Sequence, residues 1–192
     1  MAHVKELDNA LPTEPMFFMK PETALFFQGM DFPYPWFSKE VHYETELVLR
    51  ISKTAKEIDE SSASNYYDAI TVGVDFTARD LQNECKSKGH PWEKAKAFDF
   101  SAPVGVFKQL DFRGDISFGM KLNGRWAQQG HSRDMIFGFD RIVSYVSGFV
   151  TLEEGDLIFT GTPRGVGEVH VGDCLELFLE DEKVMEFNVK SL

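Results

Sequence analysis

The apolar segments of this chain are short, and turn-forming residues separate them. Runs typical of β-strands occupy residues 16–19, 46–51, 69–74, 116–122, 156–159 and 174–179. The dipeptide Asn123-Gly124, directly after the fourth of these runs, predicts a tight hairpin because both residues tolerate a positive φ. The pattern therefore predicts a mixed α/β chain that is mainly β, with a few short helices.

Helical periodicity is confined to three short segments, residues 4–9, 77–87 and 139–148. In the last of them Asp140 could cap the first turn. Residues 57–65 are polar and rich in serine, and we expect them to form a mobile loop. No internal repeat or linker divides the 192 residues, so we expect one domain that spans residues 1–192.

Charge and cysteine usage restrict the classes of partner. The net charge of −11 argues against nucleic acid or an anionic membrane. No apolar run approaches the ~20 residues that span a bilayer, and no secretory signal opens the chain. Cys85 and Cys174 lie far apart without metal or redox spacing, which indicates reduced, structural thiols. These features predict a soluble, cytoplasmic protein.

Three carboxylates are the first candidate for chemistry. Strand alternation places His42, Glu44 and Glu46 on one face, and Asp75 ends the strand-like run 69–74. Two neighbouring carboxylates repel each other unless a cation lies between them, and an all-oxygen site suits Mg²⁺ or Mn²⁺. A Glu-x-Glu pair on its own more often faces solvent.

Five motifs in one order carry a resemblance to a known family. They are His-x-Glu-x-Glu at residues 42–46, Asp-x-Thr-x-Arg-Asp at 75–80, Lys-Gly-His-Pro-Trp at 88–92 with Ala-Lys-x-Phe at 95–98, Glu-Glu-Gly-Asp at 153–156, and Thr-Gly-Thr-Pro-x-Gly-Val-Gly at 160–167. With these motifs the chain resembles the fumarylacetoacetate hydrolase family, and within it the small acylpyruvases that also decarboxylate oxaloacetate. The similarity runs from about His3 to the C-terminus. Members usually carry a further strand before the His3 segment, and we expect that strand to be missing here.

The resemblance implies a rolled, mixed β-sheet fold of the family's C-terminal domain type and a homodimer. It also implies one Mg²⁺ or Mn²⁺ per chain, held by Glu44, Glu46 and Asp75. From the pattern of the residues alone, these three carboxylates remain compatible with a plain solvated face.

The resemblance matches two further groups to catalysis. His3 and Glu6 correspond to a water-activating pair on a mobile lid, and their i, i+3 spacing would let Glu6 orient the imidazole of a helical segment. By themselves His3 and Glu6 would more often be a surface pair near the N-terminus. Lys96 corresponds to the family's Ala-Lys-x-Phe lysine, which would stabilise developing negative charge. The alternative for Lys96 is a solvated lysine, as expected for Lys94.

Substrate contacts are expected from two more segments. Arg79 and Gln82 lie three residues apart on the helix predicted after Asp75, where they could hold a substrate carboxylate. Thr162 lies in the glycine-rich run 160–167, which lacks the Gly-Lys-Ser/Thr ending of a phosphate loop. Plain surface charge and a plain turn are the alternatives. We expect His42 to support the metal ligands from behind or to belong to the core, and not to bind the metal. Lys20 matches a family segment near the pocket.

Together these features predict a metal-dependent hydrolase or lyase that cleaves a C–C bond next to a 2-oxo acid through a metal-stabilised enolate. The substrate would be a small 2-oxo acid or diacid, such as an acylpyruvate or oxaloacetate. One rival is an isomerase of the 2-hydroxyhepta-2,4-diene-1,7-dioate type, which uses the same metal chemistry but only moves a proton. Another is a non-catalytic module that binds a metal or a ligand.

Overall fold

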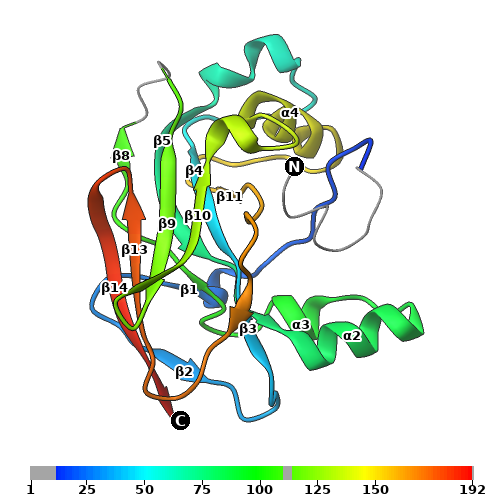
Figure 1. The fold of residues 1–192 in the computed structure, drawn as a ribbon. Helices are drawn as coiled ribbons and strands as arrows, with labels where there is room; N and C mark the ends of the chain where they lie inside the picture. The colour runs from blue at the N-terminus through cyan, green and yellow to red at the C-terminus, as the bar shows by residue number, and fades with distance from the viewer. Residues whose placement is uncertain (1–11, 110–113, 192) are drawn as a thin grey trace.

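The computed structural model describes residues 12–109 and 114–191 (Figure 1). The helices are the short α3 (Glu93–Lys96), α2 (Arg79–Lys88) and α4 (Phe139–Phe149), with 3₁₀ turns η1 (Glu22–Ala24), η2 (Glu60–Asn65) and η3 (Ser132–Asp134). The strands are β1 (Leu25–Phe26), β2 (Phe32–Tyr34), β3 (Val41–Tyr43), β4 (Thr45–Ile51), β5 (Tyr67–Val74), β6 (Thr77–Ala78), β7 (Ala102–Pro103), β8 (Lys108–Gln109), β9 (Ser117–Leu122), β10 (Arg125–His131), β11 (Leu157–Phe159), β12 (Gly167–Glu168), β13 (Cys174–Leu179) and β14 (Glu182–Ser191). The predicted class, mainly β with a few short helices, is confirmed.

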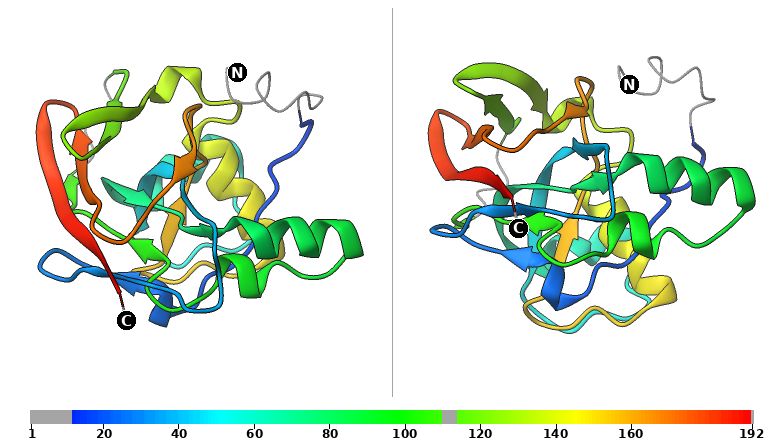
Figure 2. Two further views of the ribbon diagram at one scale, coloured as in Figure 1. Left: turned by 60° about the horizontal axis from the view of Figure 1, so that its bottom comes forward. Right: turned by 90° about the horizontal axis from the view of Figure 1, so that it is seen from below.

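The strands form four sheets with mixed pairing. A five-stranded sheet has the order β10-β9-β13-β14-β2, and a four-stranded sheet has the order β11-β4-β5-β8. Smaller sheets join β12-β3-β6 and β1-β7. In Figures 1 and 2 the strands β13 and β14 lie on the side of the molecule opposite to helices α2 and α3. Strands β3, β4, β5 and β6 meet near α2 and α3, and this region holds the predicted metal ligands.

The core consists of the inward-facing side chains of both large sheets. Leu47 and Val72 of the four-stranded sheet and Met120 and Leu177 of the five-stranded sheet are fully buried in one apolar cluster. Burial alternates with a period of two along β13, whereas the central strands β4 and β5 are buried on both faces. A second part of the same cluster is aromatic, with the rings of Phe32, Phe76, Phe26 and Phe187 in mutual contact. The core thus anchors the strands from which the acidic residues project.

Several predicted elements are confirmed, and the hairpin is the clearest. Leu122 pairs with Arg125 across the turn, and Asn123 and Gly124 adopt φ of 52° and 76°. Helix α4 matches the predicted segment 139–148, but Asp140 is not its cap. The helix begins after Gly138, and the Asp140 carboxylate accepts a hydrogen bond of 2.9 Å from the Tyr67 hydroxyl.

Other predictions were wrong at particular segments. Residues 16–19 form no strand, because this extended segment pairs with no other strand within residues 12–109 and 114–191 and packs through its aromatic side chains instead. Phe17, for example, packs against the rings of Tyr145 and Phe149. Residues 60–65, expected in a mobile loop, form the turn η2, and Ser144 Oγ on α4 donates to Ile58 O just before it. The segment predicted as helix from residue 77 begins as strand β6 and becomes helix α2 two residues later. The predicted helix at residues 4–9 lies outside the described residues.

Within residues 12–109 and 114–191, no helix combines the length and the apolar character that crossing a bilayer requires.

Candidate metal centre and active site

Two neighbouring strands bring the three carboxylates together. Glu44 occupies the short break between β3 and β4, and Glu46 is the second residue of β4. Strand β5 runs antiparallel to β4 and ends at Val74, opposite Thr45, so that Asp75 follows next to Glu44. The Asp75 amide donates to Glu44 O at 2.8 Å, which fixes this crossing. The predicted grouping of distant acidic residues is therefore a consequence of strand pairing.

The carboxylates form a compact group. One oxygen of each of Glu44, Glu46 and Asp75 lies within 4.8 Å of the others. Glu46 and Asp75 are buried, at 6% and 3% exposure, and Glu44 is half-buried. Three buried or half-buried acids this close would destabilise the fold if nothing offset their charge.

Two lysines offset much of that charge. Lys96, at the end of α3, places its Nζ 2.8 Å from Glu44 Oε2 and 2.5 Å from Asp75 Oδ2, with only 2% of the residue exposed. Lys20 Nζ lies 2.9 Å from Asp75 Oδ1 and donates to the Ser101 hydroxyl at 2.8 Å and to the Lys96 carbonyl. The segment that carries Lys20 thereby closes over the carboxylate group.

The electrostatics of the three ligand candidates differ. Burial, and then repulsion by Asp75 and Glu44, raises the pKa of Glu46 to about 8. Burial opposes ionisation of Glu44 as well, but the Lys96 ammonium and the Arg79 guanidinium outweigh it and lower the pKa of Glu44. Burial lowers the pKa of Lys20, whereas Asp75 and Glu44 overcome burial at Lys96 and raise its pKa.

The residues present fit a hard divalent cation. The donor set is made only of carboxylate oxygens, which Mg²⁺ and Mn²⁺ prefer. Within the described part of the chain, Glu46 takes part in no ion pair, and its Oε2 accepts only the Gly161 amide at 2.6 Å. The buried Asp75 Oδ1 faces Lys20 but accepts no hydrogen bond of good geometry. Glu46 and Asp75 therefore retain carboxylate oxygens that could coordinate a cation.

Helix α2 presents a guanidinium and an amide beside the carboxylates. Arg79 Nη2 lies 2.5 Å from Glu44 Oε1, and Arg79 Nη1 donates to Gln82 Oε1. Arg79 Nε donates to His42 Nδ1 at 3.4 Å. His42 therefore lies on the same side as Glu44, as strand alternation predicts, and it orients Arg79 without being one of the grouped acids.

The glycine-rich segment reaches the same place from the other side. Residues 160–166 follow strand β11 and precede strand β12, and we call them loop 160–166. Gly161 donates to Glu46, and the hydroxyl of the half-buried Thr162 accepts a hydrogen bond of 2.9 Å from Gln128 Nε2. Sequence reasoning missed Gln128 entirely, and no motif marks it. Lys20 was named only through its Phe-Met-Lys-Pro segment, although its ammonium contacts Asp75.

The structure places all but two of the predicted site residues in one region. His3 and Glu6 lie outside the described residues. The remaining ones gather around the acidic group and are Glu44, Glu46, Asp75, Arg79, Gln82, Lys96 and Thr162.

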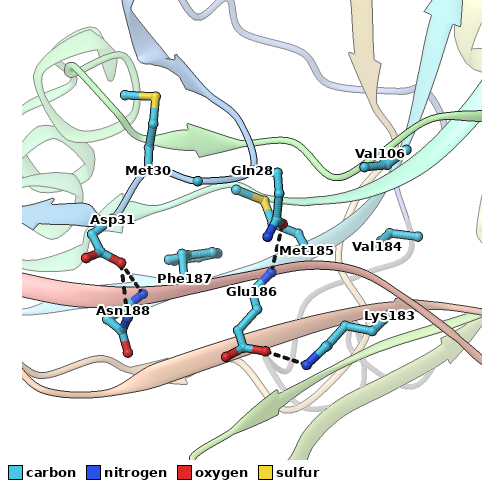
Figure 3. Close-up of a pocket in the computed structure, with 11 residues that line it drawn as sticks. Gln28, Met30, Asp31, Val106, Lys183, Val184, Met185, Glu186, Phe187 and Asn188 are labelled. Atoms are coloured by element: carbon cyan, nitrogen blue, oxygen red, sulfur yellow. Dashed lines mark hydrogen bonds and ion pairs between the residues drawn. The ribbon is translucent and has the colours of Figure 1, made fainter.

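An open pocket elsewhere on the molecule is not part of this group. It has a volume of about 450 Å³ and lies between the β1–β2 loop and the edge of β14 (Figure 3). Its polar groups satisfy one another, since Gln28 Oε1 accepts the Glu186 amide and Asp31 Oδ1 accepts the Asn188 amide. These contacts pair backbone amides of β14 in the part of the strand that β2, which pairs with Val189–Ser191, does not reach.

Known proteins are similar to this chain in sequence and in fold. The profile of the family described as fumarylacetoacetate (FAA) hydrolase, C-terminal, matches residues 1–192. The mitochondrial oxaloacetate tautomerase FAHD1 of Bos taurus is 39% identical over 191 residues, which cover 98% of this chain and 86% of the bovine protein.

Solved structures agree with the sequence comparison. The fumarylpyruvate hydrolase of Pseudomonas aeruginosa in complex with Mn²⁺ and pyruvate superposes with a TM-score of 0.91 at 33% identity, covering 100% of this chain and 85% of that one. The 2-hydroxyhepta-2,4-diene-1,7-dioate isomerase of Mycobacterium marinum superposes with a TM-score of 0.86 at 32% identity, covering 94% of this chain and 70% of that one. Because the family profile spans the whole sequence and these relatives share both sequence and fold, the chain belongs to the fumarylacetoacetate hydrolase family.

Proposed function

We propose that the chain is a divalent-metal-dependent hydrolase or lyase that cleaves a C–C bond of a small 2-oxo acid through an enolate. Acylpyruvate-type hydrolysis and oxaloacetate decarboxylation are the two reactions in view. The observation that carries the proposal is the group of three carboxylates with the Lys96 ammonium between two of them. The relatives support it, because oxaloacetate, fumarylpyruvate and 2-hydroxyhepta-2,4-diene-1,7-dioate all carry an oxygen on carbon 2 beside a carboxylate.

Glu44, Glu46 and Asp75 would hold the ion, Mg²⁺ or Mn²⁺, at one per chain. When bound, the ion supplies a Lewis acid for the 2-oxo group. Lys96 adds a positive charge that is fixed by two carboxylates and excluded from water, so it needs no reorganisation when negative charge develops on the substrate. Lys20 holds Asp75 and the Lys96 backbone in place from the opposite side.

Arg79 would bind the substrate carboxylate. A guanidinium has five N–H donors, and three are used within the described part of the chain by His42, Gln82 and Glu44. Those contacts orient the guanidinium plane, and the two remaining donors can pair with a carboxylate. Gln82, which is buried, would act through its contact with Arg79. Thr162 would supply a hydroxyl from loop 160–166.

Hydrolysis needs one more element, an activated water. The proposal assigns that task to His3 and Glu6, which lie outside the described residues. Decarboxylation of oxaloacetate needs no such base, because loss of carbon dioxide generates the enolate directly. The homodimer and the cellular compartment also stay predictions; the bovine relative is a mitochondrial protein.

A second candidate function is proton transfer without bond cleavage, either keto–enol tautomerisation of oxaloacetate or isomerisation of a hydroxylated diene-dioate. Two comparisons favour it, the 39% identity to an oxaloacetate tautomerase and the structural similarity to an isomerase. The three carboxylates and Lys96 would serve proton transfer as well as C–C cleavage, because both reactions pass through an enolate. The third alternative, a non-catalytic module, predicts metal binding without turnover.

Four substrates tested on one preparation separate these functions, the fourth being 2-hydroxyhepta-2,4-diene-1,7-dioate, whose isomerisation is followed by loss of the diene absorbance. The other three are acetylpyruvate, enol-oxaloacetate and keto-oxaloacetate, and each is incubated with the protein in the presence of Mg²⁺ or Mn²⁺, with EDTA as the metal-free control. Loss of acetylpyruvate enol absorbance with release of pyruvate supports hydrolysis, and pyruvate from oxaloacetate supports decarboxylation. Accelerated loss of enol absorbance from oxaloacetate without pyruvate supports tautomerisation. Activity that is unchanged by EDTA would refute metal dependence, and no reaction with any substrate would favour the binding module.

A further inference from the structure

Gln128 is a buried polar residue that a β-bulge turns toward the candidate site. In the β9–β10 hairpin, Trp126 pairs with Lys121, and both side chains lie together on the outer face. The register then shifts, so that Gln128 pairs with the fully buried Met120. If Ala127 were instead paired regularly with Met120, alternation would place Gln128 on the outer face with Trp126. The bulge instead leaves Gln128 only 1% exposed.

Nearly every hydrogen-bonding group of the Gln128 side-chain amide is paired, and only one orientation of the amide allows this pairing. Its Oε1 accepts the Thr45 amide at 2.8 Å, and its Nε2 donates to Thr162 Oγ1 at 2.9 Å and to Pro163 O at 3.0 Å. Rotating the amide by half a turn would set a donor against the Thr45 N–H and an acceptor against the Pro163 carbonyl. The hydrogen-bond pattern therefore fixes which side of the amide faces loop 160–166.

This one side chain joins two parts of the candidate site. Thr45 is the residue between Glu44 and Glu46, and Thr162 follows Gly161, whose amide donates to Glu46. The loop also sits directly on the bulge, because a Cβ at Gly165 would come within 2.7 Å of Ala127 O. Loop 160–166 is thus held against strand β4 through Gln128 and against β10 through Gly165.

The same contact determines the direction in which the Thr162 hydroxyl can donate a hydrogen bond. Since Gln128 Nε2 donates to Thr162 Oγ1, the hydroxyl hydrogen must point elsewhere. Within the described residues its one recorded acceptor is Pro163 O at 3.5 Å, a poor distance for an O–H donor. The Thr162 hydroxyl is therefore prepared to donate to an oxygen of a bound anion.

We propose that Gln128 is a positioning residue, which orients the Thr162 hydroxyl as a donor to the substrate and fixes loop 160–166 relative to the carboxylates. The inference rests on the proposed function, because it takes the substrate of that same site as the acceptor. Gln128 itself touches neither the carboxylates nor, on this proposal, the substrate.

The test compares Gln128→Met with Gln129→Met, a matched control at the neighbouring exposed glutamine. Methionine keeps the length of the side chain and removes its hydrogen bonds. With oxaloacetate and Mn²⁺, Gln128→Met should lower kcat/KM by about 10–100-fold, the usual effect of losing an orienting partner. Thr162→Val should cause a similar loss. The double variant Gln128→Met/Thr162→Val should stay within about threefold of the larger single loss, because the two residues act as one unit.

A second readout is independent of activity. In metal-free protein, hydrogen exchange of the amides in loop 160–166 should accelerate at least about tenfold in Gln128→Met and remain unchanged in Gln129→Met. If Gln128→Met lowers the folded fraction, Gln128→Asn replaces it, since the shorter amide cannot reach both Thr45 and loop 160–166.

Each outcome has a distinct consequence. Multiplicative losses in the double variant would overturn the inference, because Gln128 would then act independently of Thr162. Identical behaviour of the Gln128 and Gln129 variants would overturn it as well. If the unmodified protein turns over neither oxaloacetate nor acetylpyruvate, the proposed function fails and with it the role toward substrate, while the exchange data still decide whether Gln128 fixes the loop.

Discussion

Replacing Lys96 by methionine should have three effects, of which one is a gain. The ammonium contacts Glu44 and Asp75 at 2.8 and 2.5 Å, and its side chain is 3% exposed. Removing one partner of a buried ion pair costs about 3–5 kcal/mol. The lower end applies here, because Arg79 still pairs with Glu44 and Lys20 with Asp75. For a chain of this size a loss of about 3 kcal/mol lowers the unfolding temperature of the metal-free protein by roughly 6–12 °C.

The gain concerns metal affinity. Lys96 competes with a cation for oxygens of two of the three carboxylates, so its removal should tighten Mn²⁺ binding by at least about tenfold. Activity should nevertheless fall, because loss of a group that stabilises an oxyanion costs roughly 10²–10³-fold in kcat. A variant that binds metal more tightly and turns over more slowly would assign Lys96 to the chemistry rather than to holding the ion.

The assays are thermal unfolding with EDTA, calorimetric titration with Mn²⁺, and pyruvate release from oxaloacetate at saturating metal. Lys94→Met is the matched control. Lys94 lies two residues away and has a half-exposed side chain, and the one carboxylate it approaches in the described part of the chain is that of Glu84, at 3.6 Å. It should change none of the three readouts appreciably. Weaker Mn²⁺ binding in Lys96→Met, or equal effects of the two substitutions, would refute the reasoning.

Three further predictions concern the metal, the base and the assembly. Glu46→Ala should keep the fold but lose stoichiometric Mn²⁺ binding in calorimetry; retained binding would exclude this carboxylate as a ligand. His3→Ala should depress acetylpyruvate cleavage by ~10²–10⁴-fold, the usual loss of a general base, and affect oxaloacetate decarboxylation far less, so equal losses would contradict the assignment. Exposed aromatic side chains such as Phe27 and Trp36, at 51% and 86% exposure, predict a homodimer. Sedimentation at the monomer mass of 21.9 kDa would disprove it.

The acidic group could be predicted from the sequence only in part by local rules. Alternation along the extended segment places Glu44 and Glu46 together. Asp75 follows the strand that pairs with β4, but residues 52–66 separate the two strands, so its grouping with the glutamates depended on the family resemblance. The Asn123-Gly124 hairpin is predictable by local rules alone, since its turn chemistry lies within two residues.

The cations and the supporting contacts could not be predicted in this way. Lys20 lies on an extended segment without periodicity, and its contact with Asp75 spans 55 positions of sequence. Gln128 is harder still, because strict alternation from the exposed Trp126 predicts that it faces solvent. One inserted residue, Ala127, reverses that outcome, and nothing in the local sequence marks the bulge. Strand β14 was missed although Met185, Phe187 and Val189 alternate with more exposed residues. The adjacent buried residues Val184 and Met185 break the alternation near its start.

Charge balance joins the site to its proposed substrates. Within the described residues the formal charges of the group cancel when Glu46 is ionised, with Glu44, Glu46 and Asp75 facing Lys20, Lys96 and Arg79. A divalent ion adds two positive charges to a site that is largely closed to water, where an uncompensated charge is costly. The pyruvate enolate carries two negative charges, one on the carboxylate and one on the enolate oxygen, whereas the corresponding ketone carries only the carboxylate charge. The site should therefore favour the enolate, which has one negative charge more than its ketone, and this preference lowers the barrier of hydrolysis, decarboxylation and isomerisation alike. On this argument the carboxylates and lysines select the common intermediate, and the residues that supply water or a proton select the reaction.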